Sequence, residues 1–157
     1  MKISKIFIIC SILSSGLLFA KETGFKLKEF ETDGCTMFAD GTSENPTLWK
    51  HCCVAHDLRY WFGGENSQMD YSDIKLRECV KEAANEKWAN LIYLGVRAGH
   101  HSPVKNKYAW NWGWTPKRAL IPFTPIEELY IKKQLQKIHL EAVNMDEFLK
   151  TYFPSKE

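Results

Sequence analysis

Residues 49–64, WKHCCVAHDLRYWFGG, gather side chains whose types and spacing could do chemistry. Adjacent cysteines can form disulfides or bind a metal, a histidine can act as a general base, and an aspartate can bind a cation. If the stretch is a helix, Cys52, Cys53 and His56 lie on one side of it, because His56 follows the two cysteines by four and three residues. Asp57 projects about 100° away from His56 and therefore faces other partners.

Two helices are predicted to position these side chains. The first begins at Asn45 and Pro46, a favourable cap and first residue, and runs to about Phe62, where two glycines break it. The second begins at Ser67, which forms a capping-box pattern with Asp70, and its apolar stripe continues into the low nineties. The short glycine turn between the helices predicts an antiparallel hairpin.

The hairpin brings residues at equal distances from its turn level with one another. His56 and Asp73 form one such pair, and Cys52 and Cys79 form another about one helical turn further along. Asp73 occupies a position where an apolar core residue is expected, which favours a buried partner for the histidine. The sequence therefore predicts that His56 is a base oriented by Asp73, whereas Asp57 faces a loop rich in oxygen acceptors.

The chain as a whole is expected to form one exported domain. Residues 1–20 have the layout of a secretory signal, with two lysines before an apolar run and an alanine at its end. Residues 21–157 then form a single domain that is mostly α-helical. Its parts are a core at 33–98, a loop-rich tryptophan segment at 99–125 and an amphipathic C-terminal helix at 126–150.

Composition and cysteine content limit the partners and the compartment. The whole chain has 21 basic and 19 acidic residues, and both lysines of the first 20 residues leave with the signal. The balance of charge that remains does not favour nucleic acid as a partner. Four cysteines also remain, which favours disulfides in a secreted or periplasmic protein, including one that associates with the outer membrane. A bond between neighbours would strain the backbone, so two pairings stay open: Cys35 with Cys52 or Cys53, and Cys79 with the other.

Three tryptophans alternate in the stretch YAWNWGW, at Trp110, Trp112 and Trp114. Nearby lysines and an arginine suit this segment to a phospholipid membrane surface, where indole rings lie at headgroup depth. Rings that cover the helical hairpin are the other interpretation. His100 and His101, just before this stretch, are expected on the surface of a loop, where metal binding is a further option.

The stretch CCVAHDLRY resembles the CCxxHDxxY active-site helix of secreted phospholipases A2. Asp73 and Cys79 resemble the aspartate and cysteine of that family's second helix, and DGCTMFADG occupies the place of its calcium loop. The resemblance covers residues 33–79 and implies the family's disulfide-linked helical hairpin with an upstream metal loop. The disulfides that it implies are Cys35–Cys53 and Cys52–Cys79.

The resemblance also implies a reaction, the calcium-dependent hydrolysis of the sn-2 ester of a phospholipid. The catalytic set that it implies is His56, Asp73 and Tyr60. The histidine would take a proton from the attacking water, the aspartate would fix the imidazole tautomer, and the tyrosine would hydrogen-bond the aspartate. Asp57 would bind Ca²⁺ together with oxygens of the loop 34–42, to which Asp40 can add a second carboxylate.

The chain departs from the family at two places. Arg59 stands where the family's helix usually has a further cysteine, and CTMFADGT replaces the usual CGxGG of the calcium loop. Two other functions therefore stay open. One is a non-catalytic lipid- or protein-binding protein on the same scaffold, and the other is a structural module whose zinc is bound by Cys52, Cys53 and His56. Free thiols would favour zinc, and two disulfides would argue against it.

Overall fold

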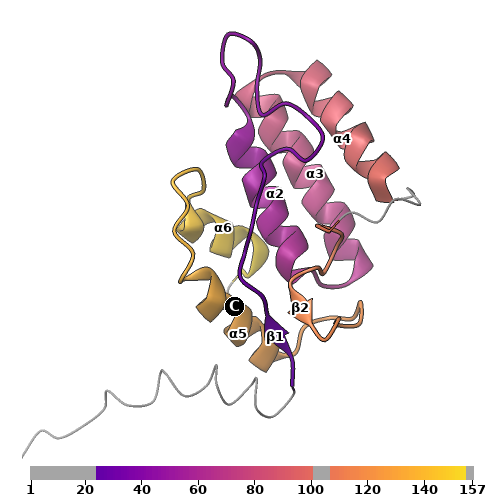
Figure 1. Ribbon diagram of the computed structural model, residues 1–157, viewed down its shortest axis with the longest axis vertical. Coiled ribbons are helices and arrows are strands. Elements are labelled where there is room, and N and C mark those ends of the chain that lie inside the picture. Colours follow the sequence, from indigo (N-terminus) through magenta and orange to yellow (C-terminus); the bar gives the residue numbers. More distant parts are fainter. Residues whose placement is uncertain (1–23, 101–106, 155–157) are drawn as a thin grey trace, which may run out of the picture.

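The computed structural model describes residues 24–100 and 107–154, and this part of the chain is mostly helical (Figure 1). Its helices are α2 (Lys50–Phe62), α3 (Asn66–Ala83), α4 (Glu86–His100), α5 (Pro125–Leu135) and α6 (Met145–Tyr152), and its short strands are β1 (Lys26–Leu27) and β2 (Trp114–Thr115). Figure 1 shows α2, α3 and α4 side by side, with α5 and α6 beside the lower half of α2. The signal expected at residues 1–20 lies outside the described residues. No helix within the described ranges is long and apolar enough to cross a lipid bilayer.

A short glycine turn joins α2 to α3, as the sequence predicts. Gly63 and Gly64 have φ angles of 66° and 137°, which glycine adopts without the steric cost of a β-carbon. Glu65 then caps α3 through a reciprocal capping box with Gln68. The cap therefore lies two residues before the predicted cap at Ser67, because a glutamate takes the role expected of the serine.

Two disulfides connect α2 to its neighbours. Cys52 is bonded to Cys79 of α3, and Cys53 is bonded to Cys35 of the preceding loop. This is the pairing that the resemblance implies, and one of the two that the spacing leaves open. Adjacent positions on a helix point about 100° apart, so the neighbouring cysteines tie α2 to two different segments. Disulfides of this kind are typical of proteins that fold in an oxidising compartment.

Helix α2 begins at Lys50 rather than at Pro46, so the predicted start is too early. Residues 46–49 form turns before the helix. Trp49 is fully buried, and its backbone N–H donates to the carbonyl of Asp40 instead of to that of Asn45. The preceding loop thus takes a donor that would have continued the helix toward its predicted cap.

The prediction of one continuous second helix into the low nineties is wrong, because the chain breaks at Ala84 and turns back as α4. Asn85 accepts the N–H of Trp88 through its side chain and the N–H of Ala89 through its carbonyl. Asparagine is among the strongest helix caps, and this one starts the new helix. The return of the chain buries apolar residues of both helices in one cluster, including Leu76, Val80, Ala89 and Ile92.

The stretch 110–114 covers the C-terminal end of α2. The last carbonyls of a helix have no partner within it, so they need donors from elsewhere. Three donors of this stretch supply them: Asn111 N to Tyr60 O, Gly113 N to Trp61 O and Trp114 Nε1 to Phe62 O. A fourth, Trp110 Nε1, donates to the carbonyl of Gly64 in the turn just after the helix. The same stretch contributes β2, which pairs antiparallel with β1.

Burial decides between the two interpretations of the tryptophans. Trp110 and Trp114 are only 8% and 3% exposed, and Trp112 is partly buried beside Phe30 and Tyr108. The prediction that Trp110 and Trp114 contact a membrane is therefore wrong, because their rings cover the hairpin and leave almost no surface for a lipid.

The C-terminal helix predicted at 126–150 is two helices, α5 and α6, joined by residues 136–144. Asn144 accepts the N–H of Glu147 and caps α6. A straight helix of 25 residues would be about 37 Å long and would carry its last apolar residues beyond the core. The turn instead folds these residues back onto the core. The apolar periodicity thus predicts correctly which residues are buried, but it wrongly predicts one continuous helix. The residues of that pattern that pack in the core are Ile131, Leu135, Ile138, Met145 and Leu149.

A buried arginine fixes the loop before α5. Arg118 is 4% exposed, and its guanidinium donates to both carboxylate oxygens of Glu127 and to three backbone carbonyls, those of residues 119, 121 and 122. Replacing it removes the cation from a carboxylate that is only 14% exposed, and it removes the guanidinium that connects this carboxylate to the three carbonyls.

Arg118→Ala is expected to lower the free energy of unfolding by about 3–5 kcal/mol, because it removes one partner of a buried ion pair. Urea unfolding monitored by tryptophan fluorescence measures the effect. Lys117→Ala, an exposed neighbour, is the control and should change stability by no more than about 0.5 kcal/mol. Equal effects of the two substitutions would contradict the structural role given to the buried guanidinium.

Candidate active site

His56 of α2 and Asp73 of α3 meet in the interior of the hairpin. The Nε2 atom of His56 lies 2.9 Å from Oδ1 of Asp73, and the Tyr60 hydroxyl donates to the same oxygen at 2.7 Å. His56 is 9% exposed and Asp73 is not exposed. The sequence-predicted trio is therefore in mutual contact, as expected from residues level with each other about the glycine turn.

The contact through Nε2 determines which nitrogen of His56 can do chemistry. Because a carboxylate accepts but does not donate, the imidazole carries its proton on Nε2 when neutral. Nδ1 is then unprotonated, and within the described residues no side chain hydrogen-bonds to it. Such an arrangement can take a proton from a nucleophile at Nδ1 while the aspartate stabilises the resulting cation.

Two residues of α4 complete the surroundings of Asp73. Arg97 Nη1 lies 3.2 Å and His100 Nε2 lies 3.5 Å from its Oδ2, and His100 Nε2 is also 2.5 Å from the Tyr60 hydroxyl. Arg97 also pairs with Asp70. The expectation that His100 lies on a loop surface is therefore wrong, because the helix continues to it and turns it inward. His101 lies outside the described residues.

These contacts shift the pKa values of the groups involved. Burial alone would raise the pKa of Asp73, but the hydrogen bond and charge of His56, with the hydrogen bond of Tyr60, hold it below its usual value. Burial and the neighbouring carboxylate raise the pKa of Tyr60, so the phenol keeps its proton. Burial lowers the pKa of His100, against the opposing charge of Asp73. The site thus holds an ionised Asp73 and a protonated tyrosine at neutral pH.

Asp57 faces away from this network and toward the preceding loop. Its Oδ2 accepts a hydrogen bond from the Thr32 hydroxyl at 2.6 Å, and the residue is 6% exposed. Burial, aided by the charges of Asp33 and Asp40, raises the pKa of Asp57 to about 7 against the opposing effect of the Thr32 hydrogen bond. No ion pair of Asp57 with a cation occurs among the residues described.

The loop 34–42 is held by its own side chains and by Cys35–Cys53. Asp40 Oδ1 accepts the backbone N–H of Cys35 at 2.8 Å, and its other oxygen lies 3.8 Å from Lys50 Nζ. Gly34 has a φ of 78°, and a β-carbon there would lie 2.3 Å from Asp40 Oδ1. Asp40 therefore braces the loop, which makes glycine at position 34 a steric requirement even though the usual CGxGG pattern is missing.

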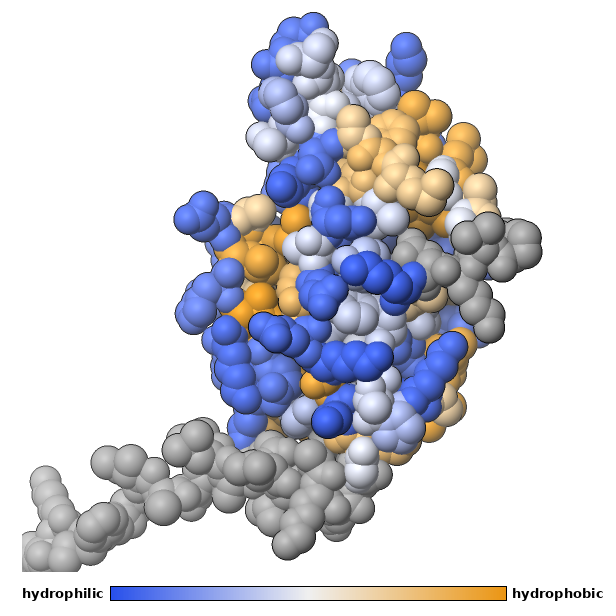
Figure 2. Space-filling view, viewed as in Figure 1, coloured by the Kyte–Doolittle hydropathy of each residue, from blue (hydrophilic) through white to orange (hydrophobic). Residues whose placement is uncertain are grey.

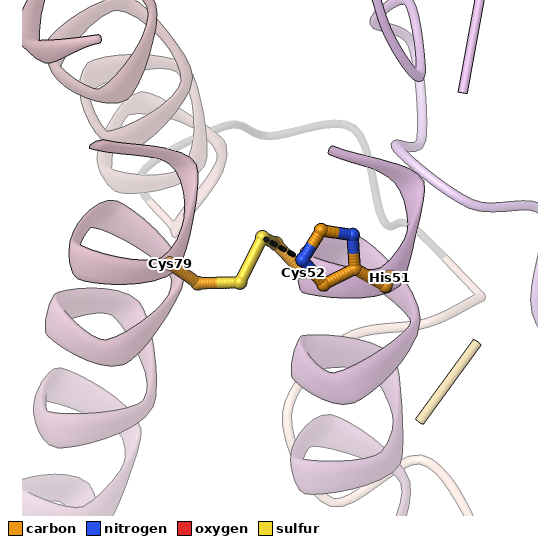
Figure 3. Close-up of side chains that lie close together, drawn as sticks. All are labelled: His51, Cys52 and Cys79. Carbon is orange, nitrogen blue, oxygen red and sulfur yellow. Dashed lines mark hydrogen bonds between the residues drawn. A yellow bond between two sulfur atoms is a disulfide. The ribbon is translucent and has the colours of Figure 1, made fainter. Parts of the chain in front are cut away.

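A different group of possible metal ligands lies at the Cys52–Cys79 disulfide. Atoms of His51, Cys52 and Cys79 lie within 4.8 Å of one another, and Figure 3 shows the ring of His51 beside the disulfide. His51 Nε2 lies 3.4 Å from Cys52 Sγ. Zinc binds thiolates, and a disulfide sulfur is not one. Because both cysteines of the zinc hypothesis, Cys52 and Cys53, are in disulfides, that hypothesis loses two of its three ligands.

Sequence reasoning missed Thr32, Arg97 and His100 as members of the site. A signal for the last two exists in α4, where polar residues at 90, 93, 97 and 100 repeat at helical spacing. The first two face α3, since Arg77 donates to Asn90 and stacks on Tyr93. Thr32 lies in irregular backbone and carries no periodic signal.

Comparisons of the chain with protein-family models, with curated proteins and with solved structures find no match. The chemistry of the site therefore follows from its side chains.

Asp57→Asn is expected to stabilise the metal-free protein at pH 8. The pKa of this carboxyl is 3.8 ordinarily and about 7 when folded, so between these values the folded chain keeps a proton that the unfolded chain loses. The free energy of unfolding therefore falls as the pH rises through this window, by roughly 1–4 kcal/mol for this one group. Asparagine has no charge to bury and should recover most of that loss.

Urea unfolding at pH 5 and pH 8 in the presence of chelator measures this effect. Glu141→Gln, at an exposed position of the turn before α6, is the control and should leave the pH dependence unchanged. A similar loss of stability in Asp57→Asn at both pH values would contradict the buried, uncompensated carboxylate.

Proposed function

We propose that the chain is an exported, calcium-dependent phospholipid hydrolase of the phospholipase A2 type, which releases the sn-2 fatty acid. The observation that carries this proposal is the contact of His56 Nε2 with buried Asp73, which leaves Nδ1 as a base. The next residue, Asp57, is a buried carboxylate that accepts from the Thr32 hydroxyl and has no cation as a partner within the described part of the chain. A base and a cation-binding group on one helix match the two needs of ester hydrolysis, an activated water and a stabilised oxyanion.

In the proposed reaction His56 takes a proton from water at Nδ1 as the water attacks the ester carbonyl. The Asp73 carboxylate stabilises the imidazolium that forms, and the Tyr60 hydroxyl donates to the same carboxylate oxygen and holds it in place. The histidine then returns the proton to the leaving alcohol oxygen. The ester is cleaved to a fatty acid and a lysophospholipid, so that atoms and protons balance.

The residues around Asp57 fit a calcium ion. Ca²⁺ takes about six to eight oxygen ligands, of which few need to be charged. A buried carboxylate whose pKa is raised by burial and by two nearby aspartates is a group that a cation would favour. Asp57 would hold the ion with oxygens of loop 34–42. When bound, calcium would polarise the ester carbonyl and stabilise its oxyanion.

A membrane surface is the proposed partner, through side chains other than the tryptophans. Met37 and Phe38 of loop 34–42 are exposed, and Phe38 packs edge-on against Trp88 of α4 at 6.3 Å. Leu91 and Leu94 continue this apolar surface along α4, and Figure 2 shows apolar residues gathered over that helix. The surface adjoins both the loop proposed to bind calcium and the helix that contacts Asp73, where a lipid substrate has to arrive.

The proposed activity is tested by fatty-acid release from phosphatidylcholine and phosphatidylglycerol vesicles, with calcium and with chelator. The oxidised protein should release the sn-2 fatty acid only when calcium is present. His56→Gln should lower turnover at least about a hundredfold because the base is lost. Asp57→Asn should lose the calcium dependence, and His139→Gln, at an exposed position, is the control.

Full activity of His56→Gln would rule out this mechanism. Absence of release by folded, disulfide-bonded protein would instead favour the non-catalytic lipid- or protein-binding protein. Calcium binding, measured by titration calorimetry, separates the two further, because only the hydrolase requires an ion at Asp57.

Leu94→Glu is expected to weaken binding to anionic vesicles about tenfold or more, because it puts a charge on the apolar surface of α4. Co-sedimentation with the vesicles measures binding, and hydrolysis of a soluble monomeric ester should stay unchanged. Ile126→Glu is the matched control, since Ile126 of α5 is 60% exposed and Leu94 is 64% exposed. Equal weakening by both substitutions would show that this surface has no special role.

A further inference from the structure

The two oxygens of the Asp73 carboxylate are divided between two helices. His56 and Tyr60 of α2 contact Oδ1, whereas Arg97 and His100 of α4 approach Oδ2. Each oxygen of a carboxylate can accept about two hydrogen bonds, so both positions of Oδ1 are in use, and Oδ2 accepts from Arg97 with His100 at 3.5 Å. Rotation of the carboxylate would break contacts on both sides at once.

The contact with the Tyr60 hydroxyl determines which ring nitrogen of His100 carries a proton. Tyr60 has one proton and donates it to Asp73, so it can only accept from His100 Nε2, which is 2.5 Å away. The 3.5 Å approach of the same nitrogen to Oδ2 of Asp73 also requires a proton there. His100 thus donates from Nε2, and a chain of contacts runs from His100 through Tyr60 to Asp73 and His56.

Packing of α4 does not require this polar contact. The apolar cluster between α3 and α4 buries Leu76, Val80, Ala89 and Ile92. Arg97 and His100 lie beyond that cluster, at the C-terminal end of α4, and the side chain of Arg97 is 34% exposed. Their polar contacts with Asp73 and Tyr60 therefore serve the site more than the docking of the helix.

We infer that Arg97 and His100 are positioning residues of the candidate active site, which hold Asp73 and Tyr60 so that Oδ1 stays aimed at His56 Nε2. This inference rests on the proposed function for its effect on rate. Without the two side chains, Oδ2 loses its guanidinium donor and Tyr60 loses the donor of His100, so the carboxylate can turn away from the histidine. A misplaced base lowers kcat without weakening the binding of the substrate.

Paired substitutions separate the donors from the bulk of the side chains. Arg97→Gln removes the positive charge and His100→Leu removes the ring N–H, whereas Arg97→Lys keeps the charge and His100→Gln keeps a donor near the Nε2 position. On a soluble monomeric ester the first pair should lower kcat by about ten- to hundredfold with KM nearly unchanged, and the second pair should recover most of that loss. Lys87→Gln, an exposed cation of α4, is the control.

A second readout does not depend on activity. The Nε2 proton of His56, hydrogen-bonded to a buried carboxylate, should give a downfield NMR signal that exchanges slowly with water. Its absence in His56→Gln assigns it. Arg97→Gln and His100→Leu should lose this signal through faster exchange, while Arg97→Lys, His100→Gln and Lys87→Gln keep it.

Unchanged kcat with a retained signal in Arg97→Gln and His100→Leu would overturn the inference. A raised KM with an unchanged kcat in Arg97→Gln would also overturn it, and would assign the arginine to substrate binding. If the unmodified protein hydrolyses no ester, the proposed function fails, but the comparison of NMR signals still decides whether the two residues position Asp73.

Discussion

The structure depends on one buried charge, the carboxylate of Asp73. Removing an ion from water costs several kcal/mol unless its partners compensate, and the interior of a small helical domain offers no water to do so. The partners here come from α2 and α4, while the carboxylate itself belongs to α3. Three helices must therefore keep a fixed register, because a shift by one turn would leave the charge unpaired. The Cys52–Cys79 disulfide fixes that register for the first two.

The contact between His56 and Asp73 could be predicted because it depends on local rules. Two glycines end one helix, the next begins at once, and residues at equal distances from the turn have to meet. The return of α4 could not be predicted in this way. Ala84 is a strong helix former, and nothing in the apolar stripe marks a break there, since the gain comes from burying Ala89 and Ile92 against the hairpin. The same reasoning applies to the break between α5 and α6, where a periodic stripe describes burial but not continuity.

The tryptophan stretch shows why composition alone can assign a membrane contact to buried residues. Alternating indoles beside lysines are typical of a membrane interface. The last turn of α2, however, leaves carbonyls without partners, and the indole N–H of Trp114 and two backbone N–H groups of this stretch donate to three of them. The indole N–H of Trp110 donates to the carbonyl of Gly64 just after the helix. The alternation places Trp110 and Trp114 on the helix end and leaves Asn111, with its positive φ of 74°, to turn the chain between them. The unpaired carbonyls at the end of α2, which no side-chain pattern reveals, determine where the rings lie.

The two buried carboxylates of the site have opposite environments, and this difference defines their roles. Asp73 has two imidazoles, a phenol and a guanidinium within reach, and its pKa is lowered. Asp57 has one hydroxyl and two like charges nearby, and its pKa is raised to about 7. A carboxylate that is satisfied within the chain can only orient its neighbours, whereas one that is desolvated without a cation destabilises the fold until something binds it. Helix α2 thus contacts one carboxylate that several groups of the chain stabilise, Asp73, and carries another that is desolvated, Asp57. Protonation or a bound cation would relieve the cost of burying Asp57.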